Sequence, residues 1–272
     1  MTTATAHAKI NLALVVGPLR SDGKHEVATV LQRLDLADEV SLAPAAGLRV
    51  NGFPEDTLVT GALKELAAAA GVEPHWLAEI EKRIPVAAGL GGGSSDAAAA
   101  LELANRTLPE PLSPEELSIV AAKLGADVPF FLTPGTQLGA GDGTQLEPLD
   151  LPLDYHVLLL LPTGAEKAST AAVYDAFDDR NGAEGFEARR QELLAAIAAR
   201  DLAKLPRNDL ASSPLARELE SRGAFRADVS GAGPCLYGLF ENEARARAAA
   251  PELERLGAVW VCSPSRGTFD AA

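Results

Sequence analysis

The spacing of apolar and polar residues divides the first third of the chain into strands and one helix. Residues 59–71 carry apolar side chains at helical spacing and end in a glycine, which predicts a helix that stops there. Residues 8–16 form a mostly apolar run, which predicts a buried strand. Further strands are expected over residues 28–36, 39–44 and 77–85.

The clearest helix signal lies at residues 113–125. Ser113 and Glu116 form a predicted capping box, with a proline at the first helical position and a glycine after the last turn. The expected buried stripe consists of Leu117, Val120, Ala121 and Leu124. The next stretch, residues 126–132, contains a proline and is therefore expected to be extended.

The second half of the chain opens with a continuous apolar run at residues 155–162, which predicts a central strand. A strand, a tight glycine turn and another strand are expected over residues 226–240, and a last strand over 258–264. Helices are expected over residues 168–178, 185–200, 214–222 and 243–257. Because strands and helices do not alternate regularly, the pattern favours an α+β protein over a doubly wound sheet.

The length of 272 residues suits one large domain or two of ordinary size. The stretch DLPLD before the central strand places the expected boundary between residues 1–152 and 153–272. With 47% hydrophobic and 23% charged residues, the composition is that of a soluble globular protein. Cys235 and Cys262 are expected to be small buried side chains rather than a disulfide.

Charge and hydropathy argue against two classes of binding partner. A formal net charge of −14 disfavours nucleic-acid binding, which needs a cationic surface. The sequence has no run of 18 apolar residues, so no membrane span is expected. The N-terminus lacks the basic region and cleavage site of a secretion signal, which predicts a cytoplasmic protein.

Residues 85–96, PVAAGLGGGSSD, form a candidate ligand-binding loop. Glycines let the backbone approach a ligand and turn its N–H groups toward an anion. A helix is expected to follow, capped by Ser94, Ser95 or Asp96, and its N-terminus adds donors and a positive dipole end. The stretch lacks the P-loop lysine, the third glycine of a dinucleotide fold and the strand that follows a protein-kinase loop. A flexible linker is disfavoured because an apolar strand and a strong helix adjoin the glycines directly.

Four stretches together resemble the GHMP small-molecule kinases. PVAAGLGGGSSDAAAAL is similar to the family's phosphate-binding motif, and LGADVPFFL to its catalytic-base segment. AKINLALVVGPLRSDGKHEV resembles its N-terminal segment, and DVSGAGPCLYGLF its third, C-terminal glycine motif. The N-terminal and base segments point to the branch that phosphorylates a cytidine-diphosphate-linked polyol in isoprenoid precursor synthesis.

The resemblance implies an α+β, two-domain GHMP kinase fold. Its N-terminal domain would be ribosomal-protein-S5-like and its C-terminal domain ferredoxin-like, with ATP and substrate meeting in the cleft between them. The reaction implied is transfer of the ATP γ-phosphoryl group to a tertiary 2-hydroxyl of the polyol. Mg²⁺ is expected to arrive with ATP, held mainly by phosphates and waters, and no metal cage in the protein is expected.

Lys9 and Asp127 match the family's active-site lysine and catalytic base. An unpaired lysine inside an apolar strand would be costly, so Lys9 is expected to have a partner, and Asp127 is the candidate. Such a pair would keep the carboxylate ionised and offset charge on the transferring phosphoryl group. The ATP-binding residues that the resemblance implies are Pro85, Val86, Ala87, Ala88, Gly89, Leu90, Gly91, Gly92, Gly93, Ser94 and Ser95.

Substrate contacts are expected from the first strand and from the second half of the chain. Asn11 lies two residues after Lys9, hence on the same face of a strand, and is assigned to substrate hydroxyls. The other substrate-binding residues that the resemblance implies are His25, Thr170 and Tyr174.

One position departs from the family pattern. Where the pattern DGYHE has a tyrosine that packs on the cytosine, this chain has Lys24, which leaves Tyr174 as the candidate for aromatic stacking. The glycine-rich stretch 139–146, which contains Asp142, fits either a loop near the substrate diphosphate or a plain hairpin turn. SGAG, residues 230–233, is expected close to the nucleotide and substrate pocket.

Three alternatives remain open. The first is another kinase of the family, of the homoserine or mevalonate type. The second is a non-catalytic ATP-binding module of the same fold, which the presence of both Lys9 and Asp127 disfavours. The third, a carbohydrate kinase of unrelated fold, does not account for the motifs. A monomer or a homodimer is expected.

Overall fold

A computed structural model describes residues 1–166 and 168–267 of the chain, and it contains two β-sheets. The larger sheet has the strand order β3-β4-β2-β5-β6, with β1 and β11 also paired to β2. Its strands are β1 (Thr2–Leu19), β2 (His25–Pro44), β3 (Arg49–Asn51), β4 (Trp76–Glu81), β5 (Thr136–Ala140), β6 (Gln145–Leu149) and β11 (Pro264–Ser265).

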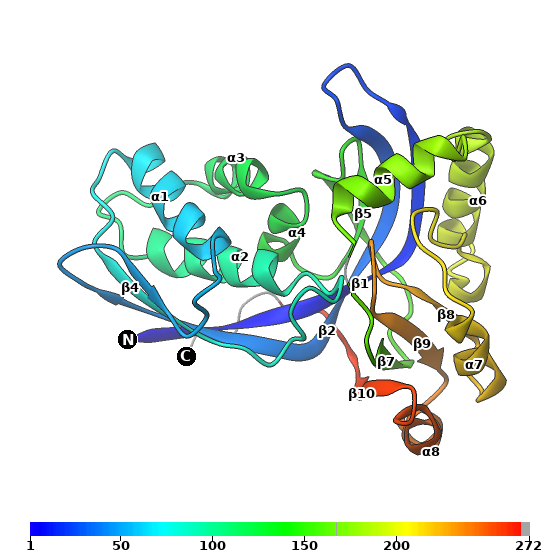
Figure 1. Cartoon of the computed structure of the whole chain (residues 1–272). Coiled ribbons are helices and arrows are strands. Elements are labelled where there is room, and N and C mark those ends of the chain that lie inside the picture. Colours follow the sequence, from blue (N-terminus) through cyan, green and yellow to red (C-terminus); the bar gives the residue numbers. More distant parts are fainter. Residues whose placement is uncertain (167, 268–272) are drawn as a thin grey trace.

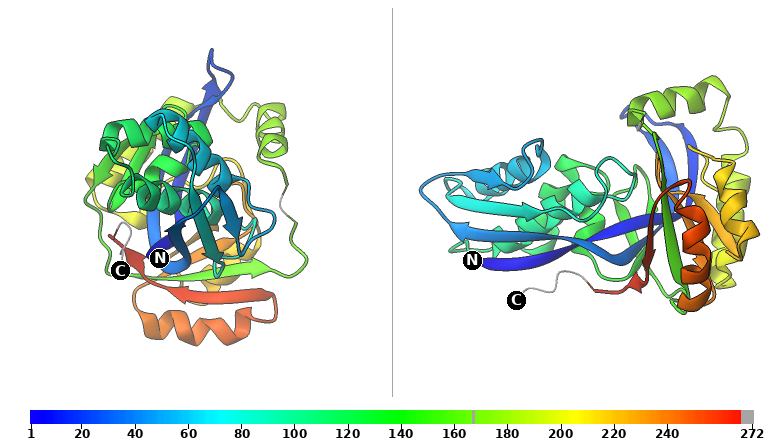
Figure 2. Two further views of the ribbon diagram at one scale, coloured as in Figure 1. Left: turned by 90° about the vertical axis from the view of Figure 1, so that its left-hand side faces the viewer. Right: turned by 60° about the horizontal axis from the view of Figure 1, so that its bottom comes forward.

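Strands β1 and β2 form a long antiparallel ribbon that runs through both halves of the molecule (Figures 1 and 2). The prediction of two strands over residues 28–36 and 39–44 was wrong, because β2 is continuous across them. The polar residues between those stretches suggested a break. Asp38, however, is 1% exposed and its carboxylate is fully bonded inside the protein, so the strand passes through.

Four helices cover one side of the larger sheet and, with it, form the N-terminal lobe (Figure 1). They are α1 (Leu58–Ala70), α2 (Gly92–Asn105), α3 (Pro114–Leu124) and α4 (Val128–Leu132). The predicted stop of α1 is confirmed, since Gly71 adopts a left-handed φ of 66°. The predicted capping box of α3 is also confirmed, with Ser113 and Glu116 bonded reciprocally.

The expectation that residues 126–132 are extended was wrong. Val128–Leu132 is helix α4, and Pro129 lies in its first turn. Proline is tolerated there because the N–H that it lacks would have no partner within the helix. The buried rings of Phe130 and Phe131 hold this short helix in the core of the N-terminal lobe.

The second sheet is antiparallel, with the order β10-β7-β9-β8, and forms the C-terminal lobe with the helices after residue 168. Strand β7 (His156–Pro162) is central, as predicted, and β8 (Arg226–Val229) and β9 (Leu236–Phe240) form the expected glycine-turn hairpin. The remaining elements are α5 (Thr170–Asp179), α6 (Phe186–Ala198), the 3-10 turn η1 (Leu202–Lys204), α7 (Leu215–Ser221), α8 (Glu243–Leu253) and β10 (Gly257–Cys262).

The order of this sheet is that of a ferredoxin-like βαββαβ unit, and the α+β class is confirmed. One face packs on the β1–β2 ribbon and α6, and the other on α7 and α8. Strand β11 follows the second sheet in the chain but pairs with β2 of the larger sheet. The C-terminal part of the chain therefore contributes to both sheets, and the boundary between residues 1–152 and 153–272 stays a prediction.

Cys235 and Cys262 are buried free thiols, as predicted. Among the described helices, none has the length and apolarity needed to cross a membrane.

Candidate active site

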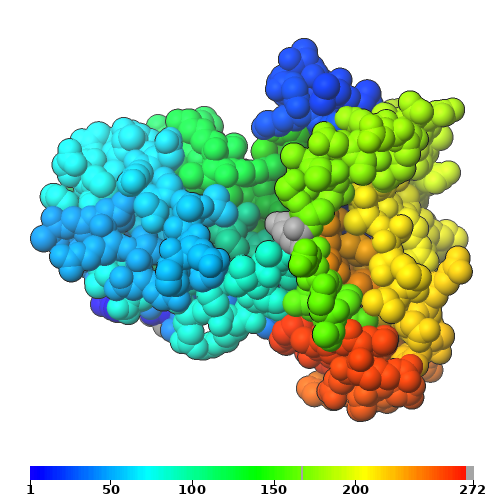
Figure 3. Space-filling model, in the orientation of Figure 1, coloured from blue at the N-terminus to red at the C-terminus, as the bar shows by residue number. Residues whose placement is uncertain are grey.

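A cleft of about 480 Å³ lies between the two lobes, where the space-filling surface is hollowed (Figure 3). This volume falls in the range of small-molecule sites. Residues of the glycine loop line it on one side and residues of α5 on the other. The residues that line it are Lys9, Asn11, Phe53, Leu58, Lys82, the loop from Pro85 to Ser94, Ala126, Asp127, Thr170, Tyr174, Leu210, Gly231 and Ala232.

The glycine loop leads directly into α2, but the helix begins earlier than predicted. It starts at Gly92 after Gly91, whose φ is 72°, and no side chain caps it. Ser94, Ser95 and Asp96 therefore lie inside the first turns rather than at the cap, and that expectation was wrong. Because no side chain occupies the cap, the first N–H groups of α2 are left for a ligand or solvent.

Two glycines of the loop are required by close contacts. A Cβ at Gly89, where φ is 83°, would lie 2.4 Å from the Ser230 carbonyl oxygen. A Cβ at Gly91 would lie 2.9 Å from Cγ of Lys9. The loop is thus packed against the lysine strand and against the C-terminal glycine motif, which fixes its path.

Hydrogen bonds hold the same loop from both lobes. The Lys9 N–H donates to the Leu90 carbonyl oxygen at 2.9 Å, from β1. The Ser230 hydroxyl donates to the Gly89 carbonyl oxygen at 2.9 Å, and Cys235 N–H to the Ala88 carbonyl oxygen at 3.0 Å. SGAG therefore lies close to the cleft, as predicted.

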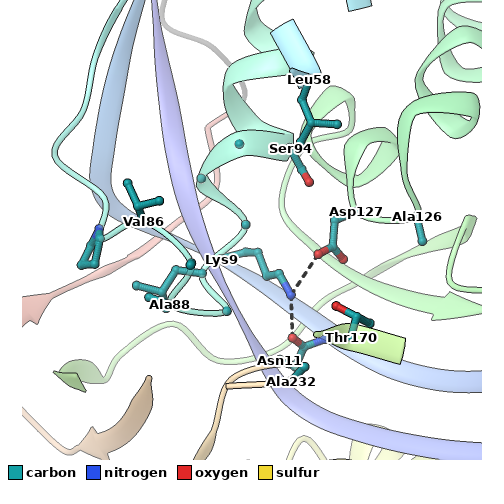
Figure 4. A pocket seen from close by; sticks show the side chains of 18 of the residues that line it. Lys9, Asn11, Leu58, Val86, Ala88, Ser94, Ala126, Asp127, Thr170 and Ala232 are labelled. Carbon is teal, nitrogen blue, oxygen red and sulfur yellow. Dashed lines mark hydrogen bonds and ion pairs between the residues drawn. The ribbon is translucent and has the colours of Figure 1, made fainter. Parts of the chain in front are cut away.

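Lys9 and Asp127 lie together on the floor of the cleft, in line with the expected partnership (Figure 4). The Lys9 Nζ is 3.3 Å from Asp127 Oδ2 and donates to Asn11 Oδ1 at 2.7 Å. The Asn11 amide donates in turn to the Thr29 hydroxyl at 2.8 Å, and that hydroxyl donates to the Ala13 carbonyl oxygen. This chain of bonds fixes the Asn11 oxygen toward the lysine and holds the ammonium in place.

The two serines of the loop differ in where their side chains lie. Ser94 lines the cleft and points into the space above Lys9 and Asp127 (Figure 4). Ser95 is 0% exposed, on the inner side of α2, and its hydroxyl has no hydrogen-bond partner among the described residues. The structure therefore does not bring Ser95 to the cleft.

The predicted substrate residues of the C-terminal lobe line the cleft from α5. Thr170 and Tyr174 both face it. Burial raises the pKa of Tyr174 to about 12, and the charge of Asp127 adds to the effect, so the phenol stays neutral at physiological pH.

His25 lies behind Tyr174 rather than on the cleft wall. Its ring stacks on Tyr174 with centroids 4.9 Å apart and an interplanar angle of 22°. Its Nδ1 lies 2.8 Å from the Gly17 carbonyl oxygen, and its Nε2 lies 3.3 Å from Asp178 Oδ2. Both ring nitrogens are therefore occupied, and His25 orients the tyrosine in this structure.

Lys24, at the position of the family's tyrosine, pairs with Asp142 at 2.5 Å. Within the stretch 139–146, residues 141–144 form the turn of a hairpin between β5 and β6, so the hairpin expectation is confirmed. A place near the substrate diphosphate stays a prediction. Partial burial opposes ionisation of Asp142, but hydrogen bonds from Lys24 and Thr144 lower its pKa to about 2. Lys24 thus ties the tip of the β1–β2 hairpin to this turn.

Sequence reasoning missed a buried charged cluster beneath the loop, formed by Asp38, Lys82 and Asp96. Lys82 Nζ contacts Asp38 Oδ2 and lies 2.7 Å from Asp96 Oδ2. Burial raises the pKa of Asp96 to about 7, although the positive charge of Lys82 acts to lower it. Burial also works against the Lys82 charge, but the two carboxylates raise its pKa above the usual value.

This cluster touches the start of α2, because a Cβ at Gly92 would lie 3.2 Å from Lys82 Nζ. The sequence signal was a lysine at the end of a strand, just before the glycine loop. In the described part of the chain, no group of three or more His, Cys, Asp or Glu residues could hold a metal ion.

Comparison with known families places both lobes in one group of enzymes. The family described as GHMP kinases N terminal domain matches residues 57–135, and GHMP kinases C terminal matches residues 183–259. A protein of Rhodococcus jostii (strain RHA1) named 4-diphosphocytidyl-2-C-methyl-D-erythritol kinase is 41% identical over 271 residues, covering 90% of this chain and 86% of its own. A protein of the same name from Salinispora arenicola (strain CNS-205) is 37% identical and covers 97% of this chain and 91% of its own.

Solved structures agree with these matches. A crystal structure of 4-(cytidine 5'-diphospho)-2C-methyl-D-erythritol kinase superimposes with a TM-score of 0.80 at 30% identity, covering 97% of this chain and 100% of that one. Homoserine kinase from Cytophaga hutchinsonii gives a TM-score of 0.77 at 16% identity, covering 100% and 97%. At that identity the second likeness shows the shared fold alone.

Proposed function

This chain belongs to the GHMP kinases, and from that premise we propose that it phosphorylates 4-diphosphocytidyl-2-C-methyl-D-erythritol. ATP is the phosphoryl donor, the 2-hydroxyl of the substrate is the acceptor, and the products are the 2-phosphate and ADP. This is a step of the non-mevalonate route to isoprenoid precursors. The relatives that carry this name match the chain over almost its whole length.

One geometric observation supports the proposal most directly. The Lys9–Asp127 pair and the open N-terminus of α2 face the same cleft, so in the proposed complex a γ-phosphoryl group bound at the helix end would face the carboxylate. Phosphoryl transfer needs positioning and charge neutralisation more than covalent chemistry. Both requirements are met by groups that the fold already holds in place.

In the proposed step, Asp127 accepts the proton of the 2-hydroxyl as its oxygen attacks the γ-phosphorus. The new O–P bond forms while the bond from the γ-phosphorus to the bridging oxygen of ADP breaks. Lys9 offsets the negative charge on the equatorial oxygens of the transferring group. Asn11 accepts a hydrogen bond from the ammonium and lines the cleft, where it is assigned to the substrate hydroxyls.

ATP is held mainly by backbone N–H groups from Gly89 to Ser94, by the helix end and by the Ser94 hydroxyl. This mode of binding needs no lysine in the loop and adds no net charge to a chain of −14. Mg²⁺ enters as part of the MgATP substrate, held by phosphates and water, and helps to neutralise the phosphate charge.

The cytidine end of the substrate is assigned to the α5 side of the cleft. Tyr174 offers the aromatic face for the base, and Thr170 a hydroxyl beside it. His25 fixes the tyrosine ring from behind, which limits its rotation before the substrate binds.

A turnover assay with 4-diphosphocytidyl-2-C-methyl-D-erythritol, ATP and Mg²⁺ tests the proposal. The expected result is ADP formation together with one new phosphate on the substrate, at the 2-position by ³¹P NMR. Homoserine and mevalonate serve as matched acceptors in the same assay. Phosphorylation of either of them, without the cytidine substrate being used, would overturn the proposal.

A further inference from the structure

Arg33 is among the largest fully buried side chains of the protein and lies on β2, with 1% of its surface exposed. Burial lowers its pKa to about 10, so it remains a cation at neutral pH. A buried charge is costly unless its donors are used. The contacts of this guanidinium are therefore informative.

The guanidinium binds the C-terminal end of α4. Its Nη2 donates to the Phe130 carbonyl oxygen at 2.5 Å, and its Nη1 donates to the Gly135 carbonyl oxygen at 3.3 Å. Its central carbon lies 4.5 Å from the centre of the Phe130 ring, a cation–π distance. Arg33 thus holds both the backbone and the side chain of one residue of the helix.

Asp127 occupies the other end of the same helix. It is the N-cap residue of α4, and its side chain makes no capping hydrogen bond. Its carboxylate is 40% exposed. The backbone position of Asp127 is therefore set by the helix, and a helix of five residues is about 8 Å long. A shift of the helix at Phe130 is therefore expected to move Asp127 as well.

The pairing of strands β1 and β2 connects these two sets of contacts. Lys9 on β1 and Arg33 on β2 are direct register partners, so their side chains leave the same face of the ribbon. Lys9 contacts Asp127 at one end of α4, and Arg33 contacts Phe130 near the other. Two neighbouring cations on paired strands therefore hold both ends of the helix that carries the assigned base.

We infer that Arg33 is a positioning residue, which sets the distance between Asp127 and Lys9 through α4. The inference rests on the proposed function, because it adds a residue to the same phosphoryl transfer. Arg33 does not line the cleft, so its effect reaches the reaction through Asp127.

Arg33→Met is expected to lower kcat by about 10- to 100-fold, since small displacements of a reacting group have effects of this size. The KM for ATP is expected to stay within about twofold, because the glycine loop is held by other contacts. Arg33→Lys keeps the cation but loses the two-pronged donor, and it is expected to recover part of the kcat.

Arg226→Met is the matched control. Arg226 is 2% exposed and bonds the carbonyl oxygens of Leu205, Pro206 and Leu12, none of which lies on α4. Its loss is expected to lower the melting temperature with kcat within about twofold.

A double-mutant cycle with Asp127→Asn separates positioning from a general loss of structure. If Arg33 acts through Asp127, adding Arg33→Met to Asp127→Asn lowers kcat no further. An equal further loss would overturn the inference, as would a single Arg33→Met variant with unchanged kcat. If Arg33→Met does not fold, Arg33→Lys enters the same cycle.

A crystal structure of the Arg33 variant provides a reading that is independent of turnover. The Lys9 Nζ–Asp127 Oδ2 distance, 3.3 Å here, is expected to lengthen in the variant and not in the Arg226 control. A parent enzyme that does not use the cytidine substrate would contradict the proposed function. An unchanged distance in the Arg33 variant would contradict the positioning role.

Discussion

The ammonium of Lys9 lies 3.3 Å from the carboxylate of Asp127, but the two side chains differ in exposure, at 4% and 40%. The lysine is anchored by Asn11 and by the strand around it, whereas the carboxylate keeps one side open to the cleft. A group that must take a proton from a substrate needs this access, and a group that neutralises charge needs a fixed place. The difference in exposure therefore suits the two tasks proposed for Asp127 and Lys9.

Asp127→Asn is expected to lower kcat by about 10²- to 10⁴-fold, the usual contribution of a general base. The asparagine has nearly the same shape and leaves the glycine loop intact, so the dissociation constant of ATP is expected to change by less than about twofold. Steady-state kinetics and calorimetric titration with ATP measure the two quantities. A variant that binds ATP normally and turns over as fast as the parent would rule out Asp127 as the base.

Gly89→Ala is expected to raise the KM for ATP about tenfold. The new methyl group would lie 2.4 Å from the Ser230 carbonyl oxygen at a residue whose φ is 83°, so the loop must move or carry strain of about 1–3 kcal/mol. Gly71→Ala is the control. Its φ is also positive, at 66°, but no atom of the described residues lies within 4 Å of the new methyl group. The control should lose stability without a change in KM, and equal KM effects in both variants would contradict the assignment of the loop.

Tyr174→Ala is expected to raise the KM for the cytidine substrate about tenfold or more, because stacking of a base on an aromatic ring contributes about 1–3 kcal/mol. The KM for ATP is expected to stay within about twofold. Tyr174→Phe keeps the ring face and should behave like the parent. If Tyr174→Ala altered both KM values equally, the base would not be stacked on this residue.

Local signals in the sequence were enough to predict many of the helices and strands. The capping box of α3, the glycine stop of α1 and the central strand β7 are each encoded within a few neighbouring residues. The need of Lys9 for a partner also followed from one strand, because a lysine among apolar residues is costly there.

The missed features depend on contacts between distant segments. Asp38 and Lys82 are 44 positions apart, and their pairing explains why β2 continues through a polar stretch. Helix α4 forms although it contains a proline, because Phe130 and Phe131 are buried in the N-terminal lobe and Arg33 binds the last turn of the helix. Neither cause can be read from local spacing, since both require the tertiary fold.

Asp96 is expected to make the stability of the protein depend on pH between about pH 4 and pH 7. Its pKa rises from 3.8 to about 7 in the folded state, mainly because it is buried. Within this window the unfolded chain releases the proton and the folded chain keeps it. The contribution of Asp96 to the free energy of unfolding therefore falls as the pH rises, and it is constant above the window.

Asp96→Asn removes this titration while keeping the shape of the side chain. The free energy of unfolding of the variant, relative to the parent, is expected to increase from pH 4 to pH 7, because the parent loses stability over that range and the asparagine does not titrate. Urea unfolding of both proteins at a series of pH values measures the difference. Glu81→Gln is a suitable control, since it removes an exposed carboxylate on the neighbouring strand β4. Parallel curves for the parent and Asp96→Asn would show that Asp96 does not titrate in this window.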